Sequence, residues 1–436
     1  MCFDLKKIYK YSIIISYLYI TEEIMNTYRL SDIYTEDRIS FQQERYEKTA
    51  NCFYEIFSQK SERFFSAPGR TEVGGNHTDH NFGKVLAASV SLDVIAAVAK
   101  SDDSIIEVKS EGFEKDTVDV SSLEPKEDER NTSAALIRGV CCGFVDRGYK
   151  IGGFKAYTTS NVLKGSGLSS SAAFEVLIGT ILNCLYNDGK ATAVEIAQIA
   201  QFAENEFFGK PSGLMDQMAS SVGSFITIDF EDPKKPVINK LDFDFKSSGH
   251  SLCIVDTKGN HADLTPEYAA IPSEMKSVAK LFGKEVLRGI SKAQILENIT
   301  LIRKKCGDRA LLRALHFVDD NERVEAEAKA LNKGDFAAFL KEINASGNSS
   351  YKYLQNIYAN KAPSEQGLSV GLYIAESVLQ GSGACRVHGG GFAGTIQAFV
   401  PNEKLEAFIS AMDKAFGDGA CHVLTVRPYG GVEVSL

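Results

Sequence analysis

The 436-residue sequence lacks the motifs of a disulfide-bonded or zinc-binding protein. Its nine cysteines are scattered and odd in number, and no Cys-x-x-Cys pair occurs, which favours the reduced thiols of a cytoplasmic protein. The seven histidines form no His-Glu-x-x-His metal motif. No apolar run approaches the roughly 18 residues that cross a bilayer, so we expect no membrane partner.

The chain also lacks an excess of positive charge. It has 48 lysines and arginines against 57 aspartates and glutamates, a formal net charge of −9. A basic nucleic-acid surface is therefore not expected, although a local basic pocket for a small anion is compatible with this balance. Apolar residues make up 44% of the chain and charged residues 24%, which permits a sizeable core, and the length predicts two or three domains.

The first 24 residues share only a loose pattern with a signal peptide. Lysines precede a short apolar stretch at residues 13–20, but Glu22 and Glu23 follow it and no small-residue cleavage site occurs. We interpret residues 1–24 as an upstream extension of unknown role. A genuine N-terminal strand or helix and a targeting segment are the alternatives.

Apolar periodicity predicts a mixture of helices and strands. Helices are expected at residues 39–60, 169–185, 191–208 and 405–416, and they also dominate between about 257 and 379. Strands are expected at residues 85–99, 154–160, 225–230, 251–257 and 422–427, with a strand–turn–strand at 384–400. Because no regular βαβ repeat occurs, the pattern predicts an α+β fold.

A polar segment at residues 231–250 marks the expected domain boundary. It separates an N-terminal domain, residues 25–240, from a C-terminal domain, residues 241–436. Within the first, the pair Pro68-Gly69 is expected to break a strand and to place Arg70 on the turn that leaves it.

A glycine-serine segment at residues 161–173, NVLKGSGLSSSAA, is the most informative motif. Its glycines allow a tight bend that turns backbone N–H groups towards a ligand, and the helix expected after it adds N–H groups and the positive end of its dipole. The segment predicts a phosphate cradle, although a plain turn with serine helix caps fits the same pattern. The cradle comprises Gly165, Ser166, Gly167, Leu168, Ser169, Ser170, Ser171 and Ala172.

Two other uses of such a segment fail on spacing. No G-x-x-x-x-G-K-[ST] sequence occurs, so the cradle is not a P-loop. No G-x-S-x-G elbow occurs either, which weakens a catalytic-serine interpretation.

A second glycine cluster, RVHGGGFAG at residues 386–394, contains a formal G-x-G-x-x-G. That fingerprint binds a dinucleotide only where it leads into a helix, whereas here it leads into the strand pattern of residues 395–400. A hairpin turn and a backbone wall beside a ligand remain as the two interpretations.

Polar side chains are dense between Arg70 and His80. The other members of this group are Glu72, Asn76, His77 and Asp79. So many hydrogen-bonding groups between apolar strands suit the recognition of a polyhydroxyl ligand, and a solvated loop is the alternative.

Two acids further along the chain are candidates for chemistry. Glu204 lies on the helix expected at residues 191–208 and is either a magnesium ligand or a surface acid. Asp216 follows a rigid Gly-Lys-Pro-Ser-Gly approach near the start of the next helix. It is either a helix N-cap or the base or positioning group for an attacking hydroxyl.

Three blocks in the same order resemble those of the GHMP small-molecule kinases: residues 68–70, 165–173 and 388–394. Within that superfamily, GRTEVGGNHTDH and AENEFFGKPSGLMDQ resemble segments of galactokinases, and the resemblance covers roughly residues 40–436. It implies an N-terminal α/β domain of the ribosomal-protein-S5 type and a ferredoxin-like C-terminal domain, with the site between them. It also implies that ATP, with Mg²⁺, phosphorylates the C1 hydroxyl of galactose.

The resemblance assigns roles residue by residue. Arg70 matches the arginine beside the transferring phosphoryl group, and Asp216 matches the carboxylate that faces the anomeric hydroxyl. Ser170 and Glu204 match the magnesium ligands. The sugar contacts it implies are Asn76, His77, Asp79, the backbone at Gly213 and, by a looser match, Tyr268.

The sequence also departs from the family pattern. Asn76 and His80 stand where glutamate and tyrosine are usual, and the amide at position 76 removes a negative charge. Ala393 and His388 stand where glycine and threonine are usual, which we interpret as lineage variation, although His388 borders the expected cleft.

These departures keep three alternatives open. Two are kinases for related sugars, galacturonate or N-acetylgalactosamine, because the charge lost at Asn76 would tolerate a carboxylate on the substrate. The third is a sensor that binds galactose and ATP without turnover, against which the retained Arg70 and Asp216 argue. We expect a monomer or weak oligomer with no nucleic-acid partner.

Overall fold

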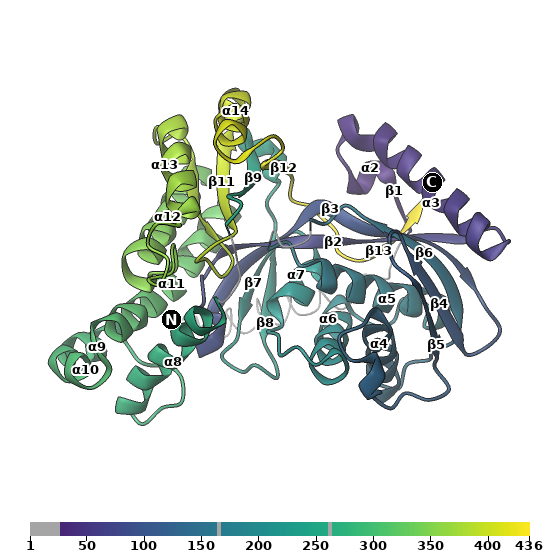
Figure 1. Cartoon of the computed structure of the whole chain (residues 1–436), viewed down its shortest axis with the longest axis horizontal. Coiled ribbons are helices and arrows are strands. Elements are labelled where there is room, and N and C mark those ends of the chain that lie inside the picture. Colours follow the sequence, from purple (N-terminus) through teal and green to yellow (C-terminus); the bar gives the residue numbers. More distant parts are fainter. Residues whose placement is uncertain (1–26, 164–166, 260–263) are drawn as a thin grey trace, which may run out of the picture.

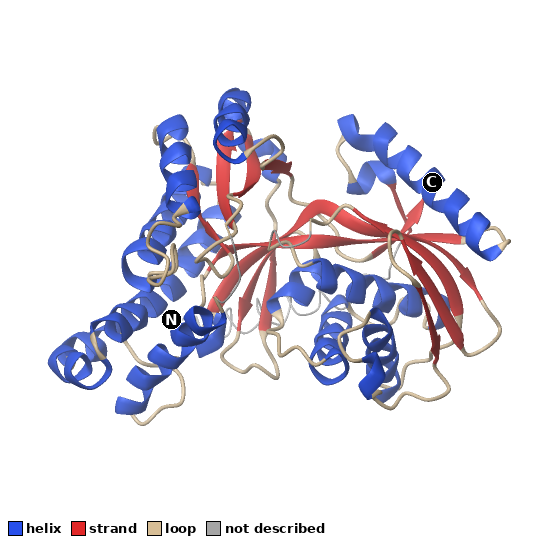
Figure 2. Cartoon of the chain, viewed as in Figure 1, coloured by secondary structure: helices blue, strands red, loops and turns tan. Residues whose placement is uncertain are grey.

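The computed structural model describes residues 27–163, 167–259 and 264–436. The expectations for residues 1–24 and for Gly165 and Ser166 lie outside these ranges. The described chain forms two β-sheets with helices packed against both (Figure 1, Figure 2), which confirms the predicted α+β fold.

The larger sheet has nine strands, in the order β1-β13-β2-β3-β6-β4-β5, with β7 paired to β3 and β8 paired to β7. They are β1 Thr27–Arg29, β2 Arg63–Gly74, β3 Lys84–Lys100, β4 Ile105–Ser110, β5 Lys115–Asp119, β6 Phe154–Ser160, β7 Phe225–Asp229, β8 Val237–Leu241 and β13 Val432–Ser435. Strand β3 is nearly all apolar and buried, as is usual for a strand covered on both faces. One half of β3 pairs with β6 and the other half with β7, so β3 joins the two parts of the sheet.

Helices cover both faces of this sheet on the right of Figure 1. Below it lie α4 Ser133–Asp146, α5 Ser170–Tyr186, α6 Ala193–Phe202, the π-helix η4 Ala203–Phe208 and α7 Met215–Val222, and above it α2 Leu30–Ile33 and α3 Ile39–Phe57. Helix α5 buries an almost continuous apolar surface, including Val176, Ile178 and Ile181, against the sheet and its neighbouring helices. The start of the helix thereby lies beside β2, where the carbonyl of Leu168 accepts from the backbone N–H of Arg70.

The smaller sheet has the strand order β10-β11-β9-β12 and stands on the left of Figure 1 with a layer of helices. Its strands are β9 His250–Asp256, β10 Ala384–His388, β11 Thr395–Pro401 and β12 Cys421–Leu424. The helices are α8 Thr265–Leu281, α9 Lys292–Glu297, α10 Ile299–Cys306, α11 Asp308–Asn332, α12 Phe336–Ser349, the π-helix η6 Ser350–Leu354, α13 Gly367–Leu379 and α14 Leu405–Phe416. Short 3₁₀ turns complete the chain: η1 Glu36–Arg38, η2 Asp79–Asn81, η3 Glu127–Glu129, η5 Phe245–Ser248 and η7 Asn402–Lys404.

Two sequence-based expectations about strands are wrong. Pro68-Gly69 does not end a strand: β2 runs on to Gly74 with a bulge between Pro68 and Arg70, so Arg70 lies within the strand rather than on a turn. The strand expected at residues 422–427, the last one expected in the chain, ends earlier, at Leu424. It is followed by an unexpected strand, β13, which pairs antiparallel with β2 and returns the C-terminal end to the larger sheet (Figure 1).

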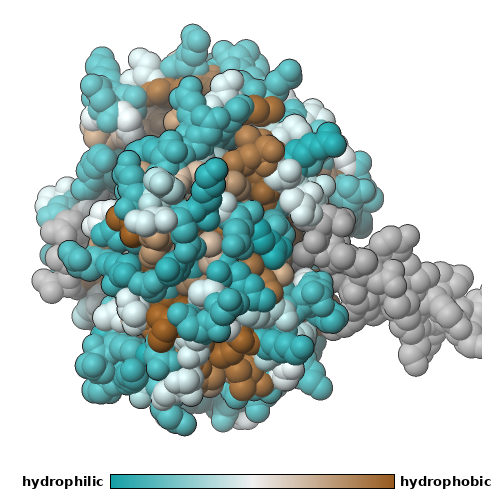
Figure 3. All heavy atoms as spheres, turned by 90° about the vertical axis from the view of Figure 1, so that its right-hand side faces the viewer, coloured by the Kyte–Doolittle hydropathy of each residue, from teal (hydrophilic) through white to brown (hydrophobic). Residues whose placement is uncertain are grey.

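The helices and the surface of the described chain can be compared with what a bilayer crossing requires. Within the described ranges, none of the helices combines the length and apolar character that a bilayer crossing requires. On the face shown in Figure 3, apolar residues form small patches amid polar ones, which is ordinary for a protein surface. The eight cysteines in the described ranges are free thiols.

Candidate active site

The predicted site residues meet where β2, the start of α5, the start of α7 and the β10–β11 turn come together. Arg70 is brought there by the bulge in β2: its backbone N–H donates to the carbonyl of Leu168 at 3.1 Å. A side chain at Gly69 would approach that same carbonyl to 2.9 Å, which explains the glycine before Arg70. The bulge thus fixes the arginine against the described end of the predicted cradle.

Arg70 and Asp216 form the central ion pair of the site. Arg70 Nε and Nη2 lie 2.8 and 2.7 Å from Asp216 Oδ1, and Arg70 Nη1 donates to the carbonyl of Gly167. The hydroxyl of Ser169, the N-cap of α5, donates to the other oxygen of Asp216 instead of capping the helix. The first backbone N–H groups of α5 are therefore left for an anionic ligand.

Asp216 is an ionised carboxylate that a substrate can reach. Burial alone would raise its pKa, but the charge and hydrogen bonds of Arg70, with the hydrogen bond from Ser169, outweigh burial and hold the pKa below its ordinary value. About 28% of the side chain is still exposed. The carboxylate is thus negative at neutral pH and partly open to solvent.

A second carboxylate, Glu204, lies behind the start of α5 and is almost fully buried. Its Oε1 accepts from Ser171 Oγ at 3.2 Å and from Lys210 Nζ at 2.7 Å, and its Oε2 accepts from Gln217 Nε2 at 2.8 Å. Gln217 donates its other hydrogen to Glu175 at 3.1 Å. Burial, and then the charge of Glu204, raise the pKa of Glu175 well above its ordinary value.

The groups around Glu204 fit a divalent cation of the magnesium type. The donors are hard oxygens, and Oε1 already has a positive charge beside it, that of Lys210. The hydroxyl that donates to Glu204 in the structure is that of Ser171. The role of Ser170 as a magnesium ligand stays a prediction. Among the described residues no cluster of three or more His, Cys, Asp and Glu side chains forms a cage, but Mg²⁺ in phosphoryl-transfer sites usually relies on water and phosphate for its other ligands.

The predicted sugar contacts gather on three successive glycine carbonyls of the β10–β11 turn. Asn76 Nδ2 donates to the carbonyl of Gly389 at 2.8 Å, His77 Nε2 to that of Gly390 at 3.0 Å, and Tyr268 Oη to that of Gly391 at 2.9 Å. The turn joins the antiparallel strands β10 and β11, which confirms the hairpin interpretation, and side chains from both parts of the chain hold it; its place beside a ligand stays a prediction.

His77 is neutral among the side chains that hold this turn. Burial, followed by the nearby His80, lowers its pKa to about 4. Because a carbonyl can only accept, Nε2 carries the proton and Nδ1 is an acceptor. Close by, a Cβ atom at Gly213 would come within 3.3 Å of Asp79 Oδ2, so the predicted contacts Asp79 and Gly213 are neighbours too.

Asn76 has a full set of partners within the protein. Its amide nitrogen donates to Glu72 at 2.9 Å as well as to Gly389, and its oxygen accepts from Asn356 at 2.8 Å and Ser350 at 3.2 Å. Its contact with a sugar stays a prediction. In this structure the amide positions the glycine turn.

Glu72 places a carboxyl group beside Asn76, the position where the family pattern has glutamate. Its Oε1 pairs with Arg386 at 2.9 Å as well as with Asn76. Burial raises the pKa of Glu72 to about 7, against the opposing influence of Arg386 and Asn76. Sequence reasoning noticed Glu72 in the polar cluster but gave it no role, because the signal lies in Arg386, more than 300 residues away in the chain.

His388 connects the two sheets beside the cradle. Gln397 donates to Thr71 Oγ1 at 2.6 Å, so the hydroxyl proton of Thr71 is available to His388 Nε2 at 3.0 Å. His388 Nδ1 lies 3.0 Å from Thr395 Oγ1. A Cβ atom at Gly167 would lie 3.1 Å from Cε1 of the ring, so the imidazole packs directly against Gly167.

We predict that His388→Ala reduces kcat/KM for the nucleotide about tenfold or more, because Gly167 loses its support and the phosphates lose their alignment. The KM for the sugar should change far less, since His77 and Tyr268 hold their own carbonyls. Steady-state kinetics with His422→Ala as a control on β12 measures both effects. A value of kcat/KM within twofold of the wild type would remove His388 from the site.

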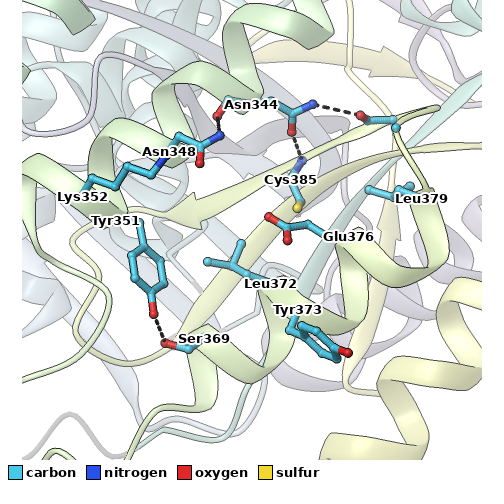
Figure 4. Close-up of a pocket in the computed structure, with 13 residues that line it drawn as sticks. Asn344, Asn348, Tyr351, Lys352, Ser369, Leu372, Tyr373, Glu376, Leu379 and Cys385 are labelled. Atoms are coloured by element: carbon cyan, nitrogen blue, oxygen red, sulfur yellow. Dashed lines mark hydrogen bonds between the residues drawn. The ribbon is translucent and has the colours of Figure 1, made fainter.

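A separate hollow of about 520 Å³ lies between α12, α13 and β10 (Figure 4). It is lined by Asn344, Asn348, Tyr351, Lys352 and Glu376, among others. On one side of the hollow, the Asn344 amide donates to the carbonyl of Gly383 and accepts from the backbone N–H of Cys385, at the start of the edge strand β10. None of the predicted site residues lines this hollow.

Comparison with known proteins agrees with this geometry. The family model of the GHMP kinases N terminal domain matches residues 135–224, and that of the galactokinase galactose-binding signature matches residues 51–100. The galactokinase of Streptomyces coelicolor is 30% identical over 371 residues, which is 84% of this chain and 91% of that protein. That of Glaesserella parasuis is 31% identical over 357 residues, covering 81% and 89%.

Solved structures share the fold. The crystal structure of Lactococcus lactis galactokinase complexed with galactose has a TM-score of 0.73 at 24% identity and covers 90% of this chain and 100% of that one. The mevalonate kinase of Methanococcus jannaschii has a TM-score of 0.59 at 15% identity, covering 84% and 98%.

Kinases for quite different small molecules thus share this pair of sheets, and the chain is one of their class, the GHMP small-molecule kinases. Within that class, the identity to the two galactokinases extends over more than four fifths of this chain, which shows the family. The chain belongs to the galactokinase family. The resemblance inferred from the three sequence blocks is confirmed, as is the two-domain fold that it implied.

Proposed function

We propose that this protein transfers the γ-phosphoryl group of ATP to the C1 hydroxyl of galactose and releases ADP and galactose 1-phosphate. The observation that carries the proposal is the Arg70–Asp216 pair held against the N-terminus of α5. A phosphate-binding helix end and a reachable carboxylate lie side by side there, which is the geometry that phosphoryl transfer to a hydroxyl requires.

In this mechanism the chain supplies position and charge. The N–H groups at the start of α5 bind phosphate oxygens, and Arg70 offsets negative charge on the phosphoryl group while it keeps Asp216 ionised. Asp216 accepts a hydrogen bond from the C1 hydroxyl and turns its lone pair towards phosphorus. Since the pKa of Asp216 is low, orientation of the hydroxyl is its main contribution. The hydroxyl proton passes to the Asp216 carboxylate late, as the new P–O bond forms and the bond from phosphorus to the ADP oxygen breaks.

Magnesium would be held by Glu204 with a serine hydroxyl at the start of α5, Ser171 in this geometry or the predicted Ser170. When bound, the ion neutralises and orients the phosphates. Gln217 fixes the direction of the Glu204 carboxylate for that purpose. The free thiols support a cytoplasmic location for the reaction.

Galactose is the substrate that the family assignment supports over galacturonate. The argument for a carboxylate-bearing substrate was the charge lost at Asn76. Both hydrogens of the Asn76 amide are already donated within the protein, to Glu72 and Gly389, so this side chain offers no free donor to a carboxylate on the sugar. A coupled ADP-release assay with galactose, galacturonate and N-acetylgalactosamine tests this choice, and turnover of galactose at the highest kcat/KM is the expected result. Binding of galactose and ATP without ADP release would instead support the sensor alternative.

We predict that Asn76→Glu destabilises the protein by about 2–4 kcal/mol instead of merely changing its sugar preference. Glutamate cannot donate to the carbonyl of Gly389, and it places a second buried carboxyl beside Glu72. Urea unfolding, with the exposed Asn348→Glu as matched control, measures the loss. An undiminished stability together with a changed ratio of kcat/KM between sugars would show that Asn76 acts on the substrate directly.

A further inference from the structure

Lys210 is a second cation of the candidate active site, and the mechanism above gives it no part. It lies in the turn between the π-helix η4 and α7, between Gly209, which has a φ of +88°, and Pro211. Its Nζ lies 2.7 Å from Glu204 Oε1, and its backbone N–H donates to the Glu204 carbonyl at 3.1 Å. The residue is therefore tied to Glu204 through both its backbone and its side chain.

The two partners differ in their exposure. The Glu204 side chain is 3% exposed, whereas that of Lys210 is 55% exposed. Among the described residues that contact the Glu204 carboxylate, Lys210 is the one cation; the others, Ser171 and Gln217, are neutral donors. The buried charge of Glu204 thus depends on Lys210 for compensation in the structure as it stands, and the exposed lysine side chain has room to turn away from it.

The oxygen that Lys210 occupies is the one that also faces Ser171. A divalent cation held between Glu204 and that hydroxyl would approach the ammonium group closely, and the two positive charges would repel each other. The ammonium must therefore leave Oε1 when the metal binds. The anion that arrives with the metal is the phosphate chain of the nucleotide. We expect the flexible four-carbon side chain of Lys210 to reach it, because its ammonium group already lies on the Glu204 oxygen that faces Ser171.

We propose that Lys210 is a phosphate-binding residue that exchanges partners: it neutralises Glu204 in the empty site and binds a phosphate oxygen of the nucleotide once a metal ion takes its place. This inference rests on the proposed function, because it needs ATP and a divalent ion at the start of α5. It adds a second positive charge to Arg70 in the loaded site. It also makes Lys210 a competitor of the metal when no nucleotide is present.

The exchange predicts opposite effects on two ligands when the charge is removed. Lys210→Met keeps the aliphatic stem and loses the ammonium. Mn²⁺ should bind to this variant about fivefold or more tightly in the absence of nucleotide, because Glu204 is no longer neutralised. The Mg²⁺ complexes of ADP and ATP, measured at saturating Mg²⁺, should bind about tenfold or more weakly, because the loaded site loses a charged hydrogen bond to phosphate.

Electron paramagnetic resonance of free Mn²⁺ and calorimetry of nucleotide binding measure the two affinities. Lys210→Arg should keep nucleotide binding, and Lys352→Met, an exposed lysine at the separate hollow of Figure 4, is the matched control. Unchanged affinities in Lys210→Met, or a loss of both, would overturn the exchange, since a merely structural lysine would not strengthen metal binding. A wild-type protein that binds no ATP would instead overturn the proposed function.

Discussion

Replacement of Asp216 by asparagine is expected to lower kcat by about 10²–10⁴-fold while ATP binding persists. The amide has the shape of the carboxylate but not its charge, so it forms no ion pair with Arg70, and it has one acceptor oxygen where the carboxylate has two. The start of α5, the proposed phosphate site, is untouched by the change apart from the hydrogen bond from Ser169.

Single-turnover kinetics and nucleotide calorimetry separate the two effects. Glu206→Gln is the matched control, because Glu206 is an exposed acid in the neighbouring π-helix. If kcat of Asp216→Asn stays within a few-fold of the wild type, the carboxylate is not the group that orients the hydroxyl.

The second large effect is expected outside the Arg70–Asp216 pair, at Asp93 in β3. This carboxylate is fully buried and pairs with Arg45 at 2.5 Å and with Arg427 at 3.0 Å. It also accepts from Ser66 at 2.6 Å and Tyr34 at 2.5 Å. Helix α3, strands β2 and β3, and the segment before β13 are thus joined by one side chain.

Asp93→Asn should lower the free energy of unfolding by about 3–5 kcal/mol, because two buried guanidinium groups lose their counter-charge. Urea unfolding measures the change, with the exposed Asp102→Asn as control. A loss below 1 kcal/mol would show that water or rearrangement replaces the pair.

The pH dependence of the same contribution has a definite sign. Burial would raise the pKa of Asp93, but Arg45 and Arg427 outweigh it and lower the pKa below its ordinary value. The stabilisation is therefore present at pH values above the unfolded pKa, near 3.9, and is lost as the pH falls through the lower folded pKa. In Asp93→Asn this part of the acid-induced loss of stability should disappear.

Elements with a strong period could be read from the sequence. Strand β6 has the predicted bounds, Phe154–Ser160, and α14 ends at Phe416 before Gly417 as predicted. Both depend on local patterns, alternation in the first case and a 3.6-residue repeat with a glycine stop in the second.

Features that depend on distant partners could not be read in this way. Residues of β13 carry no signal that they pair with β2, some 360 positions earlier, and Pro68-Gly69 marks a bulge only because a carbonyl from the start of α5 passes beside it. Local chemistry favoured a turn in this second case, and tertiary packing prevailed.

The candidate site was predicted in the same uneven way. Arg70 and Asp216 came from the family resemblance, and the structure brings them into contact. Neither the pairing of Lys210 with Glu204 nor that of Glu72 with Arg386 could be predicted, because charge pairs leave no mark in sequence spacing once a loop or a second domain separates them.

The central claim is that Asp216 faces the sugar hydroxyl while the start of α5 holds the phosphates. A crystal structure of the protein with galactose, Mg²⁺ and a non-hydrolysable ATP analogue tests it most directly. The account predicts the C1 hydroxyl within hydrogen-bond distance of Asp216 and the γ-phosphate between Arg70 and the first turn of α5. A sugar bound away from Asp216, or phosphates placed outside that turn, would contradict it.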